Sequence, residues 1–411
     1  MVPNQISKLD LIQARIDVIP PDWQLCKVAE ALNIRNNLRK PISQEVRETI
    51  KGDYPYYGPT KVQGYISEYE QDGTYALIGE DGDHFLKYAT MPQTQYISGK
   101  CTVNNHAHIL ESSEICDAQW FFNYFKHRDI TNFLSRQGAG RFKLNKATLE
   151  KLPMLVPPLP EQRKIAETLS TWDKAITTTE KLIEASKQQK KALMQQLLTG
   201  KKRLMNPETG KAFDDEWEYV RAGNVFLTRS NKKHNSDLPI LAITQDQGAV
   251  PRELIDYKVS VTDDSISGYK VVEQGDFIIS LRSFQGGIEY SRYKGICSPA
   301  YVILYPKLEL VDGFYKYHLK SHPFIQAMKS RLEGIRDGKI ISYKYFSEIK
   351  LPRPSLEEQQ KIASVLTTAD KEIEVLETKL AHLKQEKKAL MQQLLTGKRR
   401  VKVNLDMEIA I

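Results

Sequence analysis

The histidines of this 411-residue chain come closest, by type and spacing, to a chemical site. His106 and His108 stand two residues apart with His84 upstream, and on a strand that spacing points two imidazoles to one face. A zinc site would need further histidine, cysteine or carboxylate ligands at matching spacing, and none completes the set. We therefore predict a satisfied pair of histidines, in the core or at the surface, and no metal site.

Motifs that bind phosphate groups or a methyl donor are also incomplete. Gly99-Lys100 is followed by Cys101 and lacks the upstream glycine of a phosphate-binding loop, and Gly138-Ala139-Gly140 stands alone as a turn. Asn206-Pro207-Glu208 resembles the Asn/Asp-Pro-Pro-aromatic motif of amino methyltransferases, but it lacks the second proline and the aromatic residue, so we interpret it as a turn. The sequence therefore predicts a binding protein without catalytic residues.

The composition is that of a globular protein with excess positive charge. Hydrophobic residues make up 41% and charged residues 27%, and the formal net charge of +8 favours a polyanionic partner or an acidic protein surface. Four cysteines without ligand spacing (Cys26, Cys101, Cys116, Cys297) are expected to be reduced core thiols. No signal-peptide pattern opens the chain and no apolar run approaches the roughly 18 residues of a bilayer span. We expect a cytoplasmic protein without membrane segments.

Two long segments of the chain repeat each other. Lys190–Lys201 and Lys387–Lys398 are identical, at an offset of 197, and apolar residues before them recur at alternating intervals of three and four. That spacing is a heptad seam, and about 40 residues would form a helix roughly 60 Å long. The predicted seam residues are Ile165, Leu169, Trp172, Ile176, Ile183, Leu193, Leu197, Ile362, Leu366, Ile373, Leu376, Leu380, Leu383, Leu390 and Leu394.

Both ends of each predicted helix carry start and stop signals. Pro160 suits the first turn of the first helix, and Ser355 through Glu358 form a capping-box pattern before the second. Gly200 and Gly397 suit left-handed C-terminal caps. The basic runs that follow, 201–203 and 398–400, are either contacts to DNA phosphate or solvated helix ends.

The two seams are unequal, which bears on their partner. Thr179 and Ser186 of the first seam correspond to Leu376 and Leu383 of the second, so neither helix alone is a good homodimer zipper. We predict that the two helices pair with each other as an antiparallel intramolecular coiled coil. Lys190 and Lys387 fall on the seams, where they either fix the register or extend to its edge.

The segments 1–158 and 204–355 are predicted to be globular and of mixed α and β structure. Asp72-Gly73 and Asp81-Gly82 around the alternating residues 74–78 predict a hairpin, and Gly275-Asp276 before 277–281 predicts a turn and a buried strand. A faint repeat relates 117–122 to 312–317. The fold class is therefore α+β, with two mixed α/β domains alternating with two long helices. We refer to 1–158 as the first globule and 204–355 as the second globule.

These patterns resemble the specificity subunits of type I restriction–modification systems. Leu159 through Ala166, its echo Leu356 through Ala363, and each closing Leu-Leu-Thr-Gly-Lys resemble the conserved regions of that family. Weaker resemblances to its target recognition domains lie at Tyr56 through Pro59, at Gly99 through His108 and at Gly275 through Arg282. The resemblance covers essentially the whole chain.

The resemblance implies target recognition domains at 1–158 and 204–355, each reading half of a split DNA site, with spacer helices at 159–203 and 356–400 and a tail at 401–411. It implies two modification (methyltransferase) subunits docked on the helices, together with restriction (endonuclease and translocase) subunits. S-adenosylmethionine, ATP and magnesium would act on those partners, with no cofactor in this chain. Two alternatives stay open: a coiled-coil scaffold, or a DNA-binding protein outside restriction–modification.

Base readout needs Arg, Lys, Asn or Gln at base edges, with basic and hydroxyl groups on phosphates. The resulting DNA-binding candidates are Tyr57, Lys61, Gln63, Arg136, Gln137, Arg141 and Lys143 in the first globule, and Arg229, Lys232, Lys233, Arg282, Ser283, Gln285, Arg292, Arg336 and Lys339 in the second. For each, the alternative interpretation is a solvated loop residue. Arg282 and Gln285 follow a predicted strand and are the preferred pair.

Overall fold

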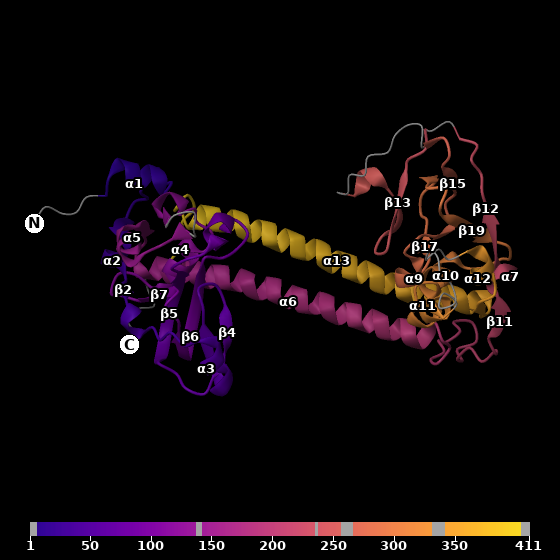
Figure 1. Ribbon diagram of the computed structural model, residues 1–411, viewed down its shortest axis with the longest axis horizontal. Coiled ribbons are helices and arrows are strands. Elements are labelled where there is room, and N and C mark those ends of the chain that lie inside the picture. Colours follow the sequence, from indigo (N-terminus) through magenta and orange to yellow (C-terminus); the bar gives the residue numbers. More distant parts are fainter. Residues whose placement is uncertain (1–5, 137–141, 235–236, 256–265, 331–341, 404–411) are drawn as a thin grey trace, which may run out of the picture. The chain divides into compact units, whose positions relative to one another are not determined.

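The chain forms two units, each built from one globule and parts of both long helices (Figure 1). The computed structural model describes residues 6–136, 142–234, 237–255, 266–330 and 342–403. The first unit comprises Met1–Thr178 with Leu380–Ile411, and the second comprises Thr179–Lys379.

The first globule is built on a six-stranded sheet in the order β2-β7-β5-β6-β3-β4, in which only β3 and β6 run parallel. Its strands are β2 (Asn33–Ile34), β3 (Lys51–Tyr57), β4 (Val62–Ile66), β5 (Gln71–Gly79), β6 (Thr94–Val103) and β7 (Ala107–Glu111). Two-stranded ladders pair β1 (Gln24–Lys27) with β10 (Pro153–Val156) and β8 (Ser135–Arg136) with β9 (Phe142–Lys143). The helical segments are α1 (Lys8–Gln13), α2 (Val28–Ala31), α3 (Gln44–Thr49), α4 (Ala118–Phe125) and α5 (Lys146–Lys151), with 3-10 turns η1 (Asn36–Leu38), η2 (Asp83–Lys87) and η3 (Thr131–Phe133).

The hairpin predicted around residues 72–82 is partly wrong. Residues 74–78 do form a strand, but Asp72-Gly73 lies inside β5, where Gly73 pairs with Gly99 of β6. The positive φ that favours glycine occurs in the partner strand, where Gly99 has a φ of +87°.

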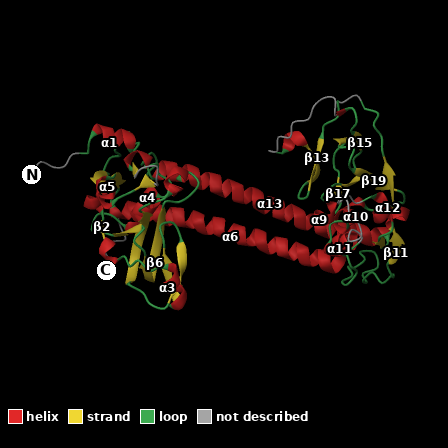
Figure 2. Ribbon diagram, viewed as in Figure 1, coloured by secondary structure: helices red, strands yellow, loops and turns green. Residues whose placement is uncertain are grey.

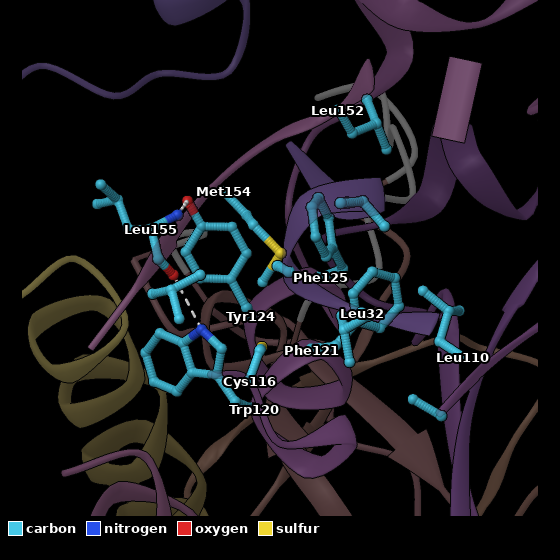
Figure 3. Close-up of a cluster of buried hydrophobic side chains, with 14 of the residues drawn as sticks. Leu32, Leu110, Cys116, Trp120, Phe121, Tyr124, Phe125, Leu152, Met154 and Leu155 are labelled. Carbon is cyan, nitrogen blue, oxygen red and sulfur yellow. Dashed lines mark hydrogen bonds between the residues drawn. The ribbon is translucent and has the colours of Figure 1, made fainter. Parts of the chain in front are cut away.

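The core of the first globule is aromatic and centred on α4 (Figure 3). Trp120, Phe121, Tyr124 and Phe125 are all buried there. The indole N–H of Trp120 donates to the carbonyl of Leu155 (2.9 Å), and the Tyr124 hydroxyl accepts from the Leu155 amide (3.2 Å). These bonds satisfy both polar groups in an apolar setting and fix α4 against β10.

The second globule has a smaller sheet in the order β12-β19-β16-β17, all antiparallel. Its strands are β12 (Phe226–Arg229), β16 (Phe277–Ile279), β17 (Glu289–Tyr290) and β19 (Val302–Pro306). Three ladders pair β11 (Glu218–Arg221) with β20 (Lys350–Arg353), β13 (Leu241–Thr244) with β14 (Gly248–Pro251), and β15 (Lys270–Val272) with β18 (Gly295–Cys297). The helical segments are α7 (Ala222–Val225), α9 (Ser283–Gly286), α10 (Asp312–His318), α11 (His322–Lys329) and α12 (Tyr343–Ser347), with 3-10 turn η4 (Arg252–Leu254).

Two predictions for the second globule are confirmed. Gly275 has a φ of +93° and precedes β16, whose three residues are buried, so the turn and the buried strand are confirmed for 277–279, whereas Leu281 at the end of the predicted range is exposed. The faint repeat also corresponds to equal elements, because Asp117 caps α4 after β7 and Asp312 begins α10 after β19. Tyr315 of α10 donates to the Pro352 carbonyl of β20 (3.0 Å), as Trp120 of α4 does to Leu155 of β10.

The long helices α6 (Leu159–Leu197) and α13 (Leu356–Leu394) have 39 residues each and pair in antiparallel fashion (Figure 2). In the first unit, Lys387 in the last two turns of α13 contacts Asp173 in the first half of α6. In the second unit, Lys190 in the last two turns of α6 contacts Asp370 in the first half of α13. Both seam lysines therefore form an ion pair with the facing helix in one and the same register.

The seam side chains all turn away from solvent to some degree. Eight of the fifteen are buried: Ile165, Leu169, Ile183, Leu197, Ile362, Leu366, Ile373 and Leu394. The other seven are partly exposed: Trp172, Ile176, Leu193, Leu376, Leu380, Leu383 and Leu390. Both helices end as their signals predict, with φ of +70° at Gly200 and +67° at Gly397. The Ser355 hydroxyl accepts from the Glu358 amide (3.3 Å) and caps α13.

A carboxylate in the first turn of each helix binds the basic end of the other. Glu161 accepts from the Trp23 indole (3.0 Å) and from two nitrogens of Arg400 (2.7 and 2.8 Å). In the second unit, Glu358 accepts from the Trp217 indole (2.8 Å) and from two nitrogens of Arg203 (2.7 and 2.8 Å). For these two arginines the structure adds a role that neither interpretation of the basic runs included, because a buried carboxylate at the helix start needs a cationic partner.

We expect Arg203→Met to destabilise the protein by about 2 kcal/mol. Breaking a fully buried ion pair costs about 3–5 kcal/mol, and the Arg203 side chain is 22% exposed, which lowers the cost. Urea unfolding followed by tryptophan fluorescence measures the change. Arg399→Met, at an exposed neighbouring position of the other helix end, is the matched control and should change stability by less than about 0.5 kcal/mol. Equal effects of the two substitutions would contradict the structural role of Arg203.

Candidate nucleic-acid interface

The candidates in the first globule fall on two neighbouring turns. Tyr57, Lys61 and Gln63 flank the turn between β3 and β4, and Gln63 accepts from the Asn104 amide (3.0 Å). Arg136 and Lys143 lie on the β8–β9 ladder. The end of β5 and the loop after it join the two groups: the Pro59 carbonyl lies beside Gly79, and the Gly82 amide donates to the Phe142 carbonyl (3.2 Å). Gln137 and Arg141 lie outside the described residues.

Exposure separates these candidates. Lys61, Gln63 and Arg136 are exposed, although Arg136 stacks over the Phe142 ring at 4.4 Å. Tyr57 is partly buried, and burial raises the pKa of its hydroxyl. Lys143 lies 3.4 Å from Glu80, which also accepts from Arg39 (2.6 Å). Lys143 therefore already neutralises a carboxylate of its own globule.

The histidine pair is built into the same end of the sheet. The His108 ring is buried, with Nδ1 2.8 Å from the Asn36 amide nitrogen and Nε2 2.7 Å from the Leu144 carbonyl. His106 Nδ1 lies 2.9 Å from the Asp81 carboxylate. Burial lowers the pKa of His108. The two rings have separate partners, and the described part of the chain holds no cluster of three or more His, Cys, Asp or Glu suited to a metal ion.

Two candidates in the second globule have structural partners. Arg229 lies 3.2 Å from the buried Asp276 carboxylate and 4.6 Å over the Tyr305 ring. The buried Ser283 hydroxyl accepts from the Ser280 amide (2.8 Å). Lys232, Lys233 and Arg292 are exposed on loops after β12 and β17, and Arg336 and Lys339 lie outside the described residues. Arg282 and Gln285 are exposed at the start and middle of α9.

A groove of about 910 Å³ lies between the long helices and the globule of the second unit. Lys187, Lys190 and Lys191 of α6 contribute to one wall. The other wall includes Gln247 and Gln285, so one candidate, Gln285, lines the groove, while Gln247 and Lys191 were missed by the sequence analysis. The signal for Gln247 was present: the turn Gln245 through Gly248 separates two short apolar runs, and Gly248 has a φ of +80°.

Hydrogen bonds join the polar loops of this wall. The Gln245 amide donates to the Arg282 carbonyl (3.5 Å), and Lys320 donates both to the Gln245 carbonyl (2.5 Å) and to the Glu289 carboxylate (2.5 Å). These bonds connect the β13–β14 turn to the residue before α9 and, through Lys320 between α10 and α11, to β17. Arg282 faces a second hollow, of about 860 Å³, which Arg252 also lines. The exposed side chains of Gln247, Arg282 and Gln285 carry the amide and guanidinium groups that can read base edges.

The floor of the groove is a charged cluster around Asp370. Its carboxylate contacts Lys190, accepts from the Tyr317 hydroxyl (2.6 Å) and lies 4.0 Å from Lys316. Burial acts to raise the pKa of Asp370, but the hydrogen bonds from Lys190 and Tyr317 hold it below its ordinary value. Burial, with Arg292 nearby, lowers the pKa of Lys316 to about 8. The cluster therefore joins the helix pair to α10 through charge.

The remaining sequence interpretations concern turns and membrane segments. Asn206 forms a turn in which its side chain accepts from the Glu208 amide (2.8 Å), as predicted. All four cysteines are buried and free. Within the described ranges, no helix combines the length and apolar character needed to cross a bilayer.

We expect Arg229→Gln to destabilise the protein by about 2 kcal/mol at pH 8, less than the cost of breaking a fully buried ion pair because the Arg229 side chain is 31% exposed, and by much less at pH 5. Burial raises the pKa of Asp276 from 3.8 in the unfolded chain to about 6 in the folded protein. The neutral carboxyl therefore contributes its full stabilisation below pH 3.8, and this contribution is lost as the pH rises through 6. Above pH 6 the carboxylate is charged and needs Arg229. Urea unfolding at both pH values measures this, with exposed Lys232→Gln as control; equal losses at the two pH values would exclude this role.

Comparison with known proteins agrees with the repeated architecture. Two segments, residues 20–188 and 214–385, match the type I restriction modification DNA specificity domain. The chain is 29% identical to a protein named as the MjaX type I restriction enzyme specificity subunit of Methanocaldococcus jannaschii (95% of this chain, 96% of that protein) and 27% identical to the MjaVIII subunit of the same organism (93% and 94%). The type I restriction–modification S subunit of M. genitalium shares the fold, with a TM-score of 0.58 at 15% identity over 92% of this chain and 97% of that one. The chain therefore belongs to the family of type I restriction–modification DNA specificity subunits.

Proposed function

We propose that this chain is the sequence-specific DNA-binding subunit of a type I restriction–modification complex, and that each globule is a target recognition domain for one half of a split DNA site. The observation that carries the proposal is that the specificity domain matches twice, once across each globule. The relatives named above are specificity subunits, and this chain aligns with nearly the whole length of each. A coiled-coil scaffold without DNA contact would not require two such domains.

The contrast between helices and globules supports the split site. The Trp–Glu–Arg contact and the Lys–Asp contact both occur once in each unit. The globules instead differ, with a six-stranded sheet and two ladders in one and a four-stranded sheet and three ladders in the other. Surfaces that bind the same thing twice can stay alike, whereas surfaces that read two different half-sites must differ.

The partners follow from the same contrast. Two copies of one modification subunit would dock on the two equivalent helix surfaces, and restriction subunits would join that assembly. Methyl transfer with S-adenosylmethionine and cleavage with ATP and magnesium would belong to those partners, while this chain acts in the cytoplasm without catalysis of its own. The paired helices would serve as a spacer, because helices hold a fixed length where a flexible linker does not.

Methylation mapping in cells that express this chain with its modification partner tests the recognition function. We expect modified bases in one split sequence with two defined half-sites and a fixed spacer, because two different globules are joined by one helix pair. Exchange of the second globule for that of a relative should replace one half-site and leave the other. The chain alone, with DNA, magnesium and S-adenosylmethionine, should neither cut nor methylate. Activity of the isolated chain, or methylation without a split pattern, would refute the proposal.

Insertion of one matched heptad into each long helix tests the spacer function. Seven residues lengthen a helix by about 10.5 Å, and base pairs rise about 3.4 Å, so the spacer should grow by about three base pairs. The inserts belong after Thr178 and after Ala381, because the Asp173–Lys387 and Lys190–Asp370 contacts then keep their register. A heptad in α6 alone breaks that register and is the matched control. An unchanged spacer in the methylated sequence of the double insertion would exclude a ruler.

A further inference from the structure

The groove of the second unit has one wall that the chain repeats and one that it does not. Nine lining positions lie on or directly after the long helices, and each is occupied by the same residue type 197 positions away in the other copy. The helices themselves are identical at only 22 of 39 positions. The globule wall, which includes Gln247 and Gln285, has no such copy.

Some identities of the helix wall have structural roles. Between 175–189 and 372–386 only four of fifteen positions are identical, and three of these four supply groove residues: Lys187, Ile373 and Glu377. Ile373 belongs to the seam, and Lys187 forms an ion pair with Glu377 of the facing helix. Lys191 and Gln195 are exposed, have neither role and are nevertheless identical to Lys388 and Gln392, so this part of the groove wall has a binding role.

The charges of the helix wall leave one lysine available. Lys187 lies 2.8 Å from Glu377, and Lys190 contacts Asp370, so both have carboxylate partners. Lys191 is exposed beside them, with no carboxylate within ion-pair distance among the described residues. Lys388 is its copy on α13 and is likewise exposed. The helix wall thus offers the same unneutralised ammonium group once per unit.

We propose that duplex DNA binds this groove, with Lys191 contacting a backbone phosphate and Gln247 and Gln285 reading base edges, and that Lys388 makes the equivalent phosphate contact in the first unit. This inference rests on the proposed function and assigns phosphate contact and base readout to different residues. Phosphates are the same in every half-site, which suits a repeated wall, whereas base edges differ, which suits a unique wall. The two modification subunits proposed above would dock on the equivalent helix surfaces outside this groove, because identical partners inside the groove would meet two different globule walls.

The test measures cognate and random duplex affinities of the complex with its modification subunits, from 50 to 200 mM salt. Lys191→Gln and Lys388→Gln should each weaken both duplexes by a similar factor and reduce the salt slope by about one. Gln247→Ala and Gln285→Ala should each weaken the cognate duplex about tenfold or more and leave the random duplex unchanged. The controls are Lys181→Gln, on the same helix outside the groove, and Gln274→Ala, exposed in the same unit.

Three outcomes would overturn the inference. The lysine variants could keep the full salt slope but lose modification subunits in size-exclusion chromatography, which would make the groove a protein-docking surface. The lysine variants could match the Lys181→Gln control in every measurement. The glutamine variants could weaken cognate and random duplexes alike. If instead the unaltered complex binds its methylated sequence no better than random duplex, the proposed function fails, and the two failures are thereby distinguished.

Discussion

A buried carboxylate at the start of each long helix is the interaction on which the architecture depends. Glu161 and Glu358 are almost inaccessible to solvent, and a charge in that position is stable only with a complete set of donors. Each receives an indole N–H from its own globule and a bidentate guanidinium from the end of the other helix. One carboxylate therefore joins three elements: the globule, the helix that begins there and the helix that ends there.

The ion pairs inside the coil extend the same constraint along the helices. A heptad seam alone would allow the two helices to slide by one repeat, because leucine and isoleucine pack similarly at each step. Lys387 with Asp173 and Lys190 with Asp370 permit one register only. The second of these contacts also includes Tyr317 of α10, so the register of the coil is set against the globule as well.

The sequence predicted the helices well because their determinants are local and repeated. Heptad spacing, Pro160 and the two terminal glycines all act within a few residues of where they stand. The strands were harder: β5 pairs with both β6 and β7, and Asp72-Gly73 was misread because its partner Gly99 lies 26 residues away. The site was the least predictable. Arg229 and Lys143 are engaged by the carboxylates of Asp276 and Glu80, which limits their availability to DNA. These partners lie far away in the sequence, and no sequence pattern predicts the pairing. Gln247 and Lys191 become neighbours only through the groove that tertiary packing forms.

The contacts of Arg400 also set the order in which the protein can be completed. Arg400 binds Glu161 and the Pro21 carbonyl, and Leu394 and Leu395 belong to the core of the first globule. During synthesis these residues leave the ribosome some 240 residues after the globule that they complete. The second globule already has Arg203, Glu358 and both of its helix segments by then. The core of the first globule therefore lacks Leu394 and Leu395 until the second globule and nearly all of α13 have been synthesised.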